Sequence, residues 1–311
     1  MIIYTSPIHI ALSRSEPTMS LPTLARNFRH IARTILLPPI QEGPVPLRRN
    51  IGGPQCPDHR PFLLLDAVKQ SGSAPAFGPH PHRGQETITY VLEGTVDHRD
   101  SRGNEGVLKT GDLQFMCAGR GVVHDETPAV DEKTGALYGV QVWVALPAEE
   151  LGSEAKYSDL KAKEIPVVRP TEGVEVRVIA GEAFGVKMPL RTKGAVHYLD
   201  IRLQPGVKVE LPITPGFNAL AHVLGGTPTV AGHVAEMHET VLFDRKGDGV
   251  LLANQGSEPA HMLLLSGDPL DGQEIHRNGP FVSNTRKGAF QAWVDFEERK
   301  HGFENIGHMF Q

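Results

Sequence analysis

Short runs of alternating apolar and polar residues dominate the chain. The segment "ETITYVLEGTVDHRD" (86–100) alternates over one strand length, turns at Glu93-Gly94 and then alternates again. "FLLLDAVKQ" and "YGVQVWVALP" are further strand-like runs, and glycine-containing turns separate them. Short strands at this spacing predict an all-β fold, built as an antiparallel barrel or sandwich.

A second series of strand-like runs follows the polar, charged stretch "AEELGSEAKYSDLKAKEIP" (148–166), which we interpret as a bridge between two domains. Residues 218–227, "NALAHVLGGT", are similar to residues 86–95, "ETITYVLEGT", and share the pattern V-L-x-G-T with them. The displacement of 132 residues and the matching rhythm of strands predict a duplicated domain.

The last part of the chain changes from strand rhythm to helical spacing. Apolar residues recur there at positions that share one side of a helix, namely Phe290, Trp293, Val294 and Phe296, so we expect a short closing helix. The predicted domains are an N-terminal extension at 1–40, a first barrel domain at 41–165, and a second at 166–311 that includes the helix.

The composition is that of a soluble globular protein, with 40% hydrophobic and 22% charged residues. A net charge of −5 argues against direct binding to nucleic acid or to a membrane surface. No apolar stretch is long enough for a transmembrane helix. Two cysteines, Cys56 and Cys117, do not make a disulfide framework, so we expect a reducing compartment, the cytoplasm or the nucleus.

The first 40 residues differ from the rest, because four arginines stand there against the single acid Glu16. Arginine, serine and an apolar rhythm in "LARNFRHIARTILL" resemble an organelle transit peptide. The alternatives, which we favour, are a disordered extension or a true start at Met19.

Two pairs of potential metal ligands share the spacing i, i+2, which places both side chains on one face of a strand. His80 and His82 form the first pair, and His124 and Glu126 follow 44 residues later. On neighbouring barrel strands the pairs would set three imidazoles and one carboxylate around one point. Such a ligand set suits a divalent iron-type ion with open coordination positions, and zinc or copper also accepts it.

The second copy lacks these residues. At the displacement of 132 residues, His80 and His82 correspond to Pro212 and Thr214, and Glu86 corresponds to Asn218. Metal chemistry is therefore expected only in the first half, with one ion per chain.

The segment "HPHRGQETITYVLEGTVDHRDSRGNEGVLKTGDLQFMCAGRGVVHDE" resembles the signature of the pirin family of the cupin superfamily, and "GPFVSNTR" resembles the pirin C-terminus. The resemblance runs from about residue 45 to the end. It implies two tandem cupin domains with metal only in the first, bound by His80, His82, His124 and Glu126. Many cupins use the acid at the position of Glu86 as a ligand, and here the resemblance implies that Glu86 orients a ligand from outside the coordination shell.

The resemblance also implies a function, a mononuclear dioxygenase that combines O2 with a flavonol such as quercetin by 2,3-dioxygenation. Fe(II) is the first choice of metal, with Zn, Cu, Mn or Ni as alternatives. As a ligand that can detach, Glu126 would also be the catalytic base that takes the substrate's hydroxyl proton.

Two other functions remain open at this point. The first is a metal-bound, redox-responsive module that binds a protein partner and acts as a transcriptional cofactor. The second is a metal-dependent sugar isomerase, which would use zinc and need no O2. In each case we expect a monomer.

Overall fold

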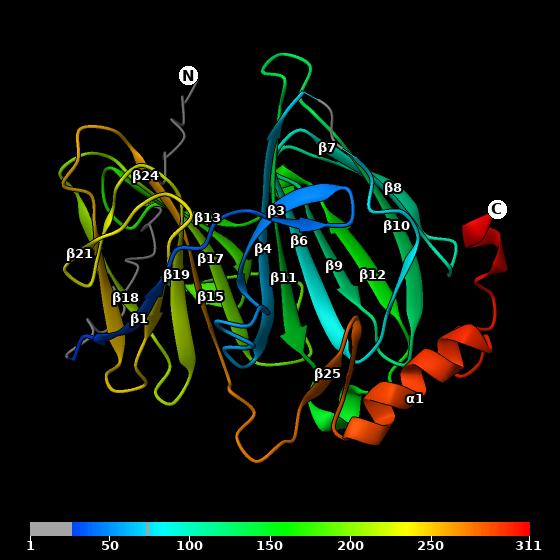
Figure 1. Cartoon of the computed structure of the whole chain (residues 1–311). Coiled ribbons are helices and arrows are strands. Elements are labelled where there is room, and N and C mark those ends of the chain that lie inside the picture. The colour runs from blue at the N-terminus through cyan, green and yellow to red at the C-terminus, as the bar shows by residue number, and fades with distance from the viewer. Residues whose placement is uncertain (1–26, 73–74) are drawn as a thin grey trace, which may run out of the picture.

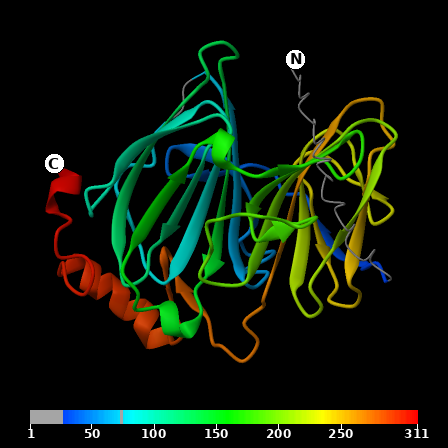
Figure 2. The ribbon, with the colours of Figure 1, turned by 180° about the vertical axis from the view of Figure 1, so that it is seen from behind.

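The computed structural model describes residues 27–72 and 75–311, and it consists of two antiparallel β-barrels with one α-helix near the C-terminus. Figure 1 shows the barrels side by side, and Figure 2 shows the same pair from behind. The predicted all-β architecture with a short closing helix is confirmed. In the described part of the chain, no helix is long and apolar enough to cross a membrane.

The first barrel pairs a seven-stranded sheet, in the order β12-β9-β6-β11-β4-β3-β2, with a four-stranded sheet, in the order β5-β10-β7-β8. The chain turns between β6 and β7 at Gly94, as predicted. The strands are β2 (Ile40–Glu42), β3 (Val45–Ile51), β4 (Phe62–Ser71), β5 (His80–His82), β6 (Gln85–Glu93), β7 (Thr95–Asp100), β8 (Glu105–Lys109), β9 (Leu113–Cys117), β10 (Val122–Ala129), β11 (Ala136–Ala145) and β12 (Lys156–Leu160).

The second barrel repeats this topology, with the sheets β1-β22-β19-β24-β17-β14-β13 and β18-β23-β20-β21. Strand for strand the order matches the first barrel, with β19 in the place of β6, as the sequence repeat predicts. The strands are β1 (Ile31–Ile35), β13 (Val167–Val168), β14 (Val174–Ala180), β17 (Val196–Leu203), β18 (Lys208–Pro212), β19 (Asn218–Gly225), β20 (Thr229–Val230), β21 (His233–Val234), β22 (Thr240–Phe243), β23 (Gly249–Ala253) and β24 (Ala260–Gly267). A separate small hairpin comprises β15 (Glu182–Ala183) and β16 (Val186–Lys187).

The seven-stranded sheets contact each other across the middle of the molecule. The Tyr90 hydroxyl on β6 donates to Asp200 on β17 at 2.6 Å, and the Tyr138 hydroxyl on β11 donates to the carbonyl of Leu224 at 3.4 Å. Central strands of the first sheet are therefore covered on both faces, by the barrel interior and by the second barrel. This explains why β6 is buried along most of its length instead of alternating.

Part of the predicted N-terminal extension belongs to the second barrel. Strand β1 pairs with β22 at the edge of the second sheet, and the side chain of Arg29 is buried among backbone carbonyls there. The prediction of an extension through residue 40 therefore needs correction from residue 27 onward. Residues 1–26, which include Met19, lie outside the described residues, but most of the stretch at 24–37 that resembles a transit peptide is described and includes β1.

The stretch at 148–166 is more than a polar bridge. It contains β12, which pairs with β9 at the edge of the first sheet, before the chain reaches β13 in the second. The domain boundary predicted near residue 165 falls between these two strands.

After the second barrel the chain returns to the first. The hairpin of β25 (His276–Asn278) and β26 (Phe281–Ser283) leads into α1 (Arg286–Glu297), which lies beside the first barrel in Figure 1. Backbone hydrogen bonds join Arg83 to Pro280 and Val282, so the hairpin meets the turn after β5. The helix was predicted from its apolar residues, but Phe290 and Val294 are exposed and the buried side holds Ala289 and Ala292.

Candidate metal centre

The two predicted pairs of ligands lie on neighbouring strands. Strands β5 and β10 are antiparallel, with His80 directly opposite His124. The ring nitrogens of His80, His82 and His124 that face one another all lie within 4.8 Å, which makes these residues a group that could hold a metal ion. His82 and His124 are fully buried.

Glu126 lies beside this group, on the same face of β10 as His124, but is not part of the group of three close ligands. Its Oε2 lies 3.8 Å from Nε2 of His124, and the side chain is buried. Burial raises the pKa of this carboxyl, and the neighbouring His80 and a hydrogen bond from Gln141 oppose that effect. Burial also lowers the pKa of His82 and of His124 well below the ordinary imidazole value. Both rings are therefore neutral near pH 7, and a neutral imidazole keeps one nitrogen lone pair.

Each histidine has an outer contact on its second ring nitrogen. His80 Nδ1 lies 2.8 Å from the carbonyl of Gly78, and His124 Nδ1 lies 2.8 Å from the hydroxyl of Tyr157. His82 Nδ1 lies 2.9 Å from the amide of Gln85. Contacts of this kind fix the orientation of imidazoles that ligate metals.

The donor set fits a divalent cation. The Gly78 carbonyl can only accept, so His80 carries its proton on Nδ1 and turns a bare Nε2 toward Nε2 of His124, 2.8 Å away. Nε2 of His82 is buried and has no hydrogen-bond partner. A buried ring nitrogen without a partner is costly, and a cation bound by the three histidines would give Nε2 of His82 a partner.

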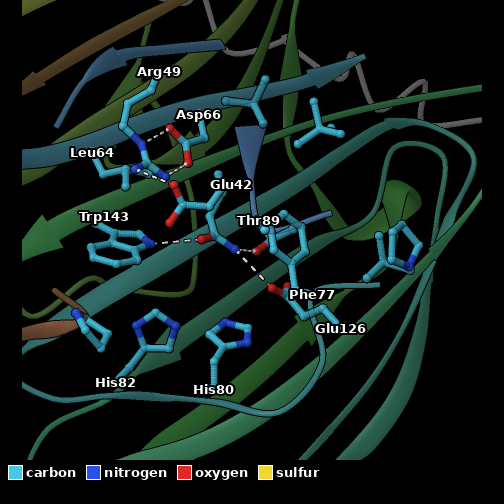
Figure 3. A pocket seen from close by; sticks show the side chains of 18 of the residues that line it. Glu42, Arg49, Leu64, Asp66, Phe77, His80, His82, Thr89, Glu126 and Trp143 are labelled. Carbon is cyan, nitrogen blue, oxygen red and sulfur yellow. Dashed lines mark hydrogen bonds and ion pairs between the residues drawn. The ribbon is translucent and has the colours of Figure 1, made fainter. Parts of the chain in front are cut away.

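The cluster opens into a cavity of about 470 Å³, a size typical of small-molecule sites. Figure 3 shows His80, His82 and Glu126 on one side of it and Arg49, Asp66 and Glu42 on another. Apolar side chains supply most of the wall, and the C-terminal segment contributes Trp293 to it. The apolar lining includes Leu64, Val68, Phe77, Val91, Val96, Leu137, Val140, Trp143 and Trp293.

Two residues that the sequence pattern did not single out, Gln141 and Trp143, also lie beside the cluster. Both lie on β11 and line the cavity, at the spacing i, i+2 that places them on one face. The Gln141 amide is 3.3 Å from Oε2 of Glu126, and the Trp143 ring packs edge-on against His82 with a centroid distance of 5.0 Å. A polar residue within the alternating run "YGVQVWVALP" is the signal that marks this position.

Glu86 does not have the contacts expected of a residue that orients a ligand. Both of its carboxylate oxygens accept from the backbone N–H of Lys193 at 3.0 Å, in the segment that precedes β17 of the second barrel. Gln85, Thr87 and Thr89 occupy the cavity side of β6, so Glu86 lies on the face toward the second barrel. The prediction that Glu86 orients a ligand therefore needs correction, and the side chains that contact His82 and Glu126 are Gln85 and Gln141.

The duplication explains what Glu86 does instead. Its counterpart Asn218 donates to the carbonyl of Arg60 at 2.6 Å, in the segment that precedes β4 of the first barrel. Each barrel thus uses the same position of the repeat to bind the backbone of the other barrel.

The second barrel has no histidine at the positions that correspond to His80 and His82. Pro212 and Thr214 are exposed, and the buried residues between and beside them are Ile213 and Leu211. Within residues 27–72 and 75–311, His80, His82 and His124 form the one group of three close potential ligands.

A pair of barrels in which the first holds a histidine cluster that could bind a metal ion defines a bicupin. The sequence profile of Pirin matches residues 45–144, and that of the Pirin C-terminal cupin domain matches residues 198–302. The chain belongs to the pirin family.

Relatives match along most of their length. Pirin of Homo sapiens is 40% identical over 264 residues, which cover 83% of this chain and 88% of the human protein. A pirin-like protein of Solanum lycopersicum is 35% identical over 290 residues, 92% of this chain and 97% of the relative. The crystal structure of a quercetin 2,3-dioxygenase from Acinetobacter baumannii superposes with a TM-score of 0.81 at 33% identity, covering 89% of this chain and 99% of that one.

Proposed function

We propose that this chain is a mononuclear metal-dependent dioxygenase that acts on flavonols such as quercetin, with Fe(II) as the metal. The observation that carries the proposal is the opening of the three-histidine cluster into a largely apolar cavity of about 470 Å³. Similarity to a quercetin 2,3-dioxygenase at 33% identity supports the choice of substrate class.

His80, His82 and His124 would hold the metal, and Glu126, which lies beside His124, would be the fourth ligand. When bound, a divalent metal of this type lowers the pKa of a substrate hydroxyl and brings that substrate together with O2. The neutral imidazoles provide nitrogen donors, and the outer contacts of His80 and His124 hold the rings in place.

Glu126 is the base in this proposal. It borders the cavity, and burial raises the pKa of its carboxyl, which makes it a better proton acceptor than a solvated carboxylate. The apolar walls exclude water and accept a flat aromatic molecule, which binds by burial of its rings.

The test combines metal analysis with O2 uptake. We expect protein purified without added metal to contain about one equivalent of a divalent ion and to consume O2 with at least one member of a flavonol panel. His124→Ala should lose both properties, because it removes a nitrogen donor. His233→Ala, at a half-buried histidine of the second barrel, is the matched control and should keep both. Metal-loaded protein that consumes no O2 with any flavonol would contradict the proposed function.

A further inference from the structure

The side-chain amide of Gln141 lies at the centre of a hydrogen-bonded row beside the metal cluster. Its Oε1 accepts from the indole N–H of Trp143 at 2.8 Å. Its Nε2 donates to Oε2 of Glu126 and to the hydroxyl of Thr89, at 3.3 Å in each case. Figure 3 shows Trp143, Thr89 and Glu126 around this row, on the wall that faces His80 and His82.

Donor chemistry fixes the direction of the row. An indole N–H can only donate, so the amide atom beside Trp143 must be the oxygen. The amino end then faces Glu126, whose ionised carboxylate can only accept. Turning the amide over would set oxygen against carboxylate and N–H against N–H, so Trp143 decides which end Glu126 meets.

Trp143 is itself held in place. Its strand neighbours on β11 pair with β4 and β6, and its ring meets that of His82 edge-on, at an interplanar angle of 87°. One side chain therefore packs against one predicted ligand and, through Gln141, fixes the hydrogen bond to another.

We infer that Gln141, oriented by Trp143, is a positioning residue that holds the Glu126 carboxylate toward the three histidines. The inference rests on the proposed function only in that Glu126 is taken as a metal ligand. The oxygen that Gln141 binds is the one that lies 3.8 Å from Nε2 of His124, so the amide restrains the atom nearest the cluster. Removing the restraint leaves the carboxylate free to turn into the cavity.

Metal affinity is the direct measurement, made by competition between the protein and a chelator for Fe(II) under anaerobic conditions. We expect Gln141→Met, which keeps the length of the side chain without its donors, to weaken Fe(II) binding by roughly tenfold. Trp143→Phe should weaken it in the same direction but by less, since the ring against His82 remains and only the fixed direction of the amide is lost.

The matched control is Gln114→Met. Gln114 is a buried glutamine of the same barrel whose amide donates to Asp159 and makes no hydrogen bond to the four predicted ligands. The same chemical change there should lower stability without changing Fe(II) affinity. Equal losses of affinity in Gln114→Met and Gln141→Met would overturn the inference, because the effect would then be structural.

A double-mutant cycle tests whether Gln141 acts through Glu126. In a Glu126→Gln background, Gln141→Met should cost little further affinity, because the charged acceptor is already gone. Equal losses in both backgrounds would overturn the inference, and so would unchanged affinity in both Gln141→Met and Trp143→Phe. O2 uptake measured on the same proteins separates the two proposals: non-additive metal affinities without any flavonol-dependent uptake would uphold Gln141 and reject the dioxygenase.

Discussion

The predicted ligands differ in what their loss leaves behind. His82→Ala or His124→Ala deletes a nitrogen donor inside a buried cluster, so each should abolish stable metal binding. Glu126→Gln keeps one oxygen but removes the charge and the proton acceptor, so O2 uptake should fall much further than metal content. Glu86→Gln should leave metal content unchanged, because its carboxylate binds Lys193.

Elemental analysis of the four variants side by side checks this order. Loss of metal in Glu86→Gln, with normal unfolding behaviour, would place the carboxylate ligand at 86 and contradict the order.

Glu86 also makes stability depend on pH. Burial raises its pKa to about 7, well above the ordinary glutamate value near 4.5. The folded protein therefore binds the proton of the Glu86 carboxyl more tightly than the unfolded chain does. The stability that this carboxyl contributes is present below pH 4.5 and is lost as the pH rises through 7. A shift of this size corresponds to at most about 3 kcal/mol.

We therefore expect the wild-type protein to gain stability relative to Glu86→Gln when the pH falls from 8 to 5. Urea unfolding of both proteins at the two pH values measures the difference. A difference that stays constant with pH would mean that Glu86 is ionised throughout.

The alternation of side chains along a strand predicted the histidine cluster but not the position of Glu86. His82 and Glu86 are four residues apart, which on an uninterrupted strand would place them on one face. Gly84, with φ of +81°, turns the chain between β5 and β6 and resets the parity. A Cβ at this position would lie 2.0 Å from the carbonyl oxygen of Val282, so a contact with the distant C-terminal segment requires glycine. Periodicity within one segment carries no information about such a contact.

The strands themselves were largely predictable, because apolar alternation is local. Strand β1 was not predictable, because the arginine-rich segment that contains it matches a transit peptide as well as an edge strand. Arg29, which lies just before β1, anchors this strand to the second barrel. Its side chain donates to backbone carbonyls at 214–217 and 244–247.

The buried guanidinium of Arg29 should stabilise the second barrel through several hydrogen bonds. It donates to the carbonyls of Phe217 at 2.6 Å and Thr214 at 3.1 Å. Arg29→Met leaves these oxygens without a donor, so the free energy of unfolding should fall by roughly 2–4 kcal/mol. Arg33→Met, an exposed residue of β1, is the matched control and should change it by less than about 1 kcal/mol. Equal urea midpoints for the two variants would show that β1 is not held by Arg29.

Each barrel is completed by a segment from the other half of the sequence. The N-terminal β1 adds to the second barrel, and the C-terminal segment covers the first. The cavity beside the histidine cluster is therefore lined by the first domain and by a segment that follows the second domain. A first barrel expressed alone would lack Trp293 and Pro280 from the wall of its cavity.

An ion pair between Arg83 and Asp295 joins the C-terminal helix α1 to the end of the strand that carries His80 and His82. Arg83 follows the predicted ligand His82 in the chain, and its Nη1 lies 2.7 Å from Oδ2 of Asp295 on α1. The same guanidinium donates to the carbonyls of Arg120 and His301, both at 2.7 Å. Breaking one partner of a partly buried pair costs several kcal/mol, because the remaining charge is left unpaired.

Asp295→Ala should therefore loosen α1 and speed the transfer of Fe(II) from the protein to a chelator by at least about tenfold. Glu297→Ala, an exposed acid on the same helix, is the control and should leave the rate unchanged. Limited proteolysis shows independently whether α1 has come away. If protease cuts the helix of Asp295→Ala more readily and the transfer rate stays the same, the C-terminal segment does not control access to the metal. If both change together, the link between α1 and the first barrel also determines how long the metal stays.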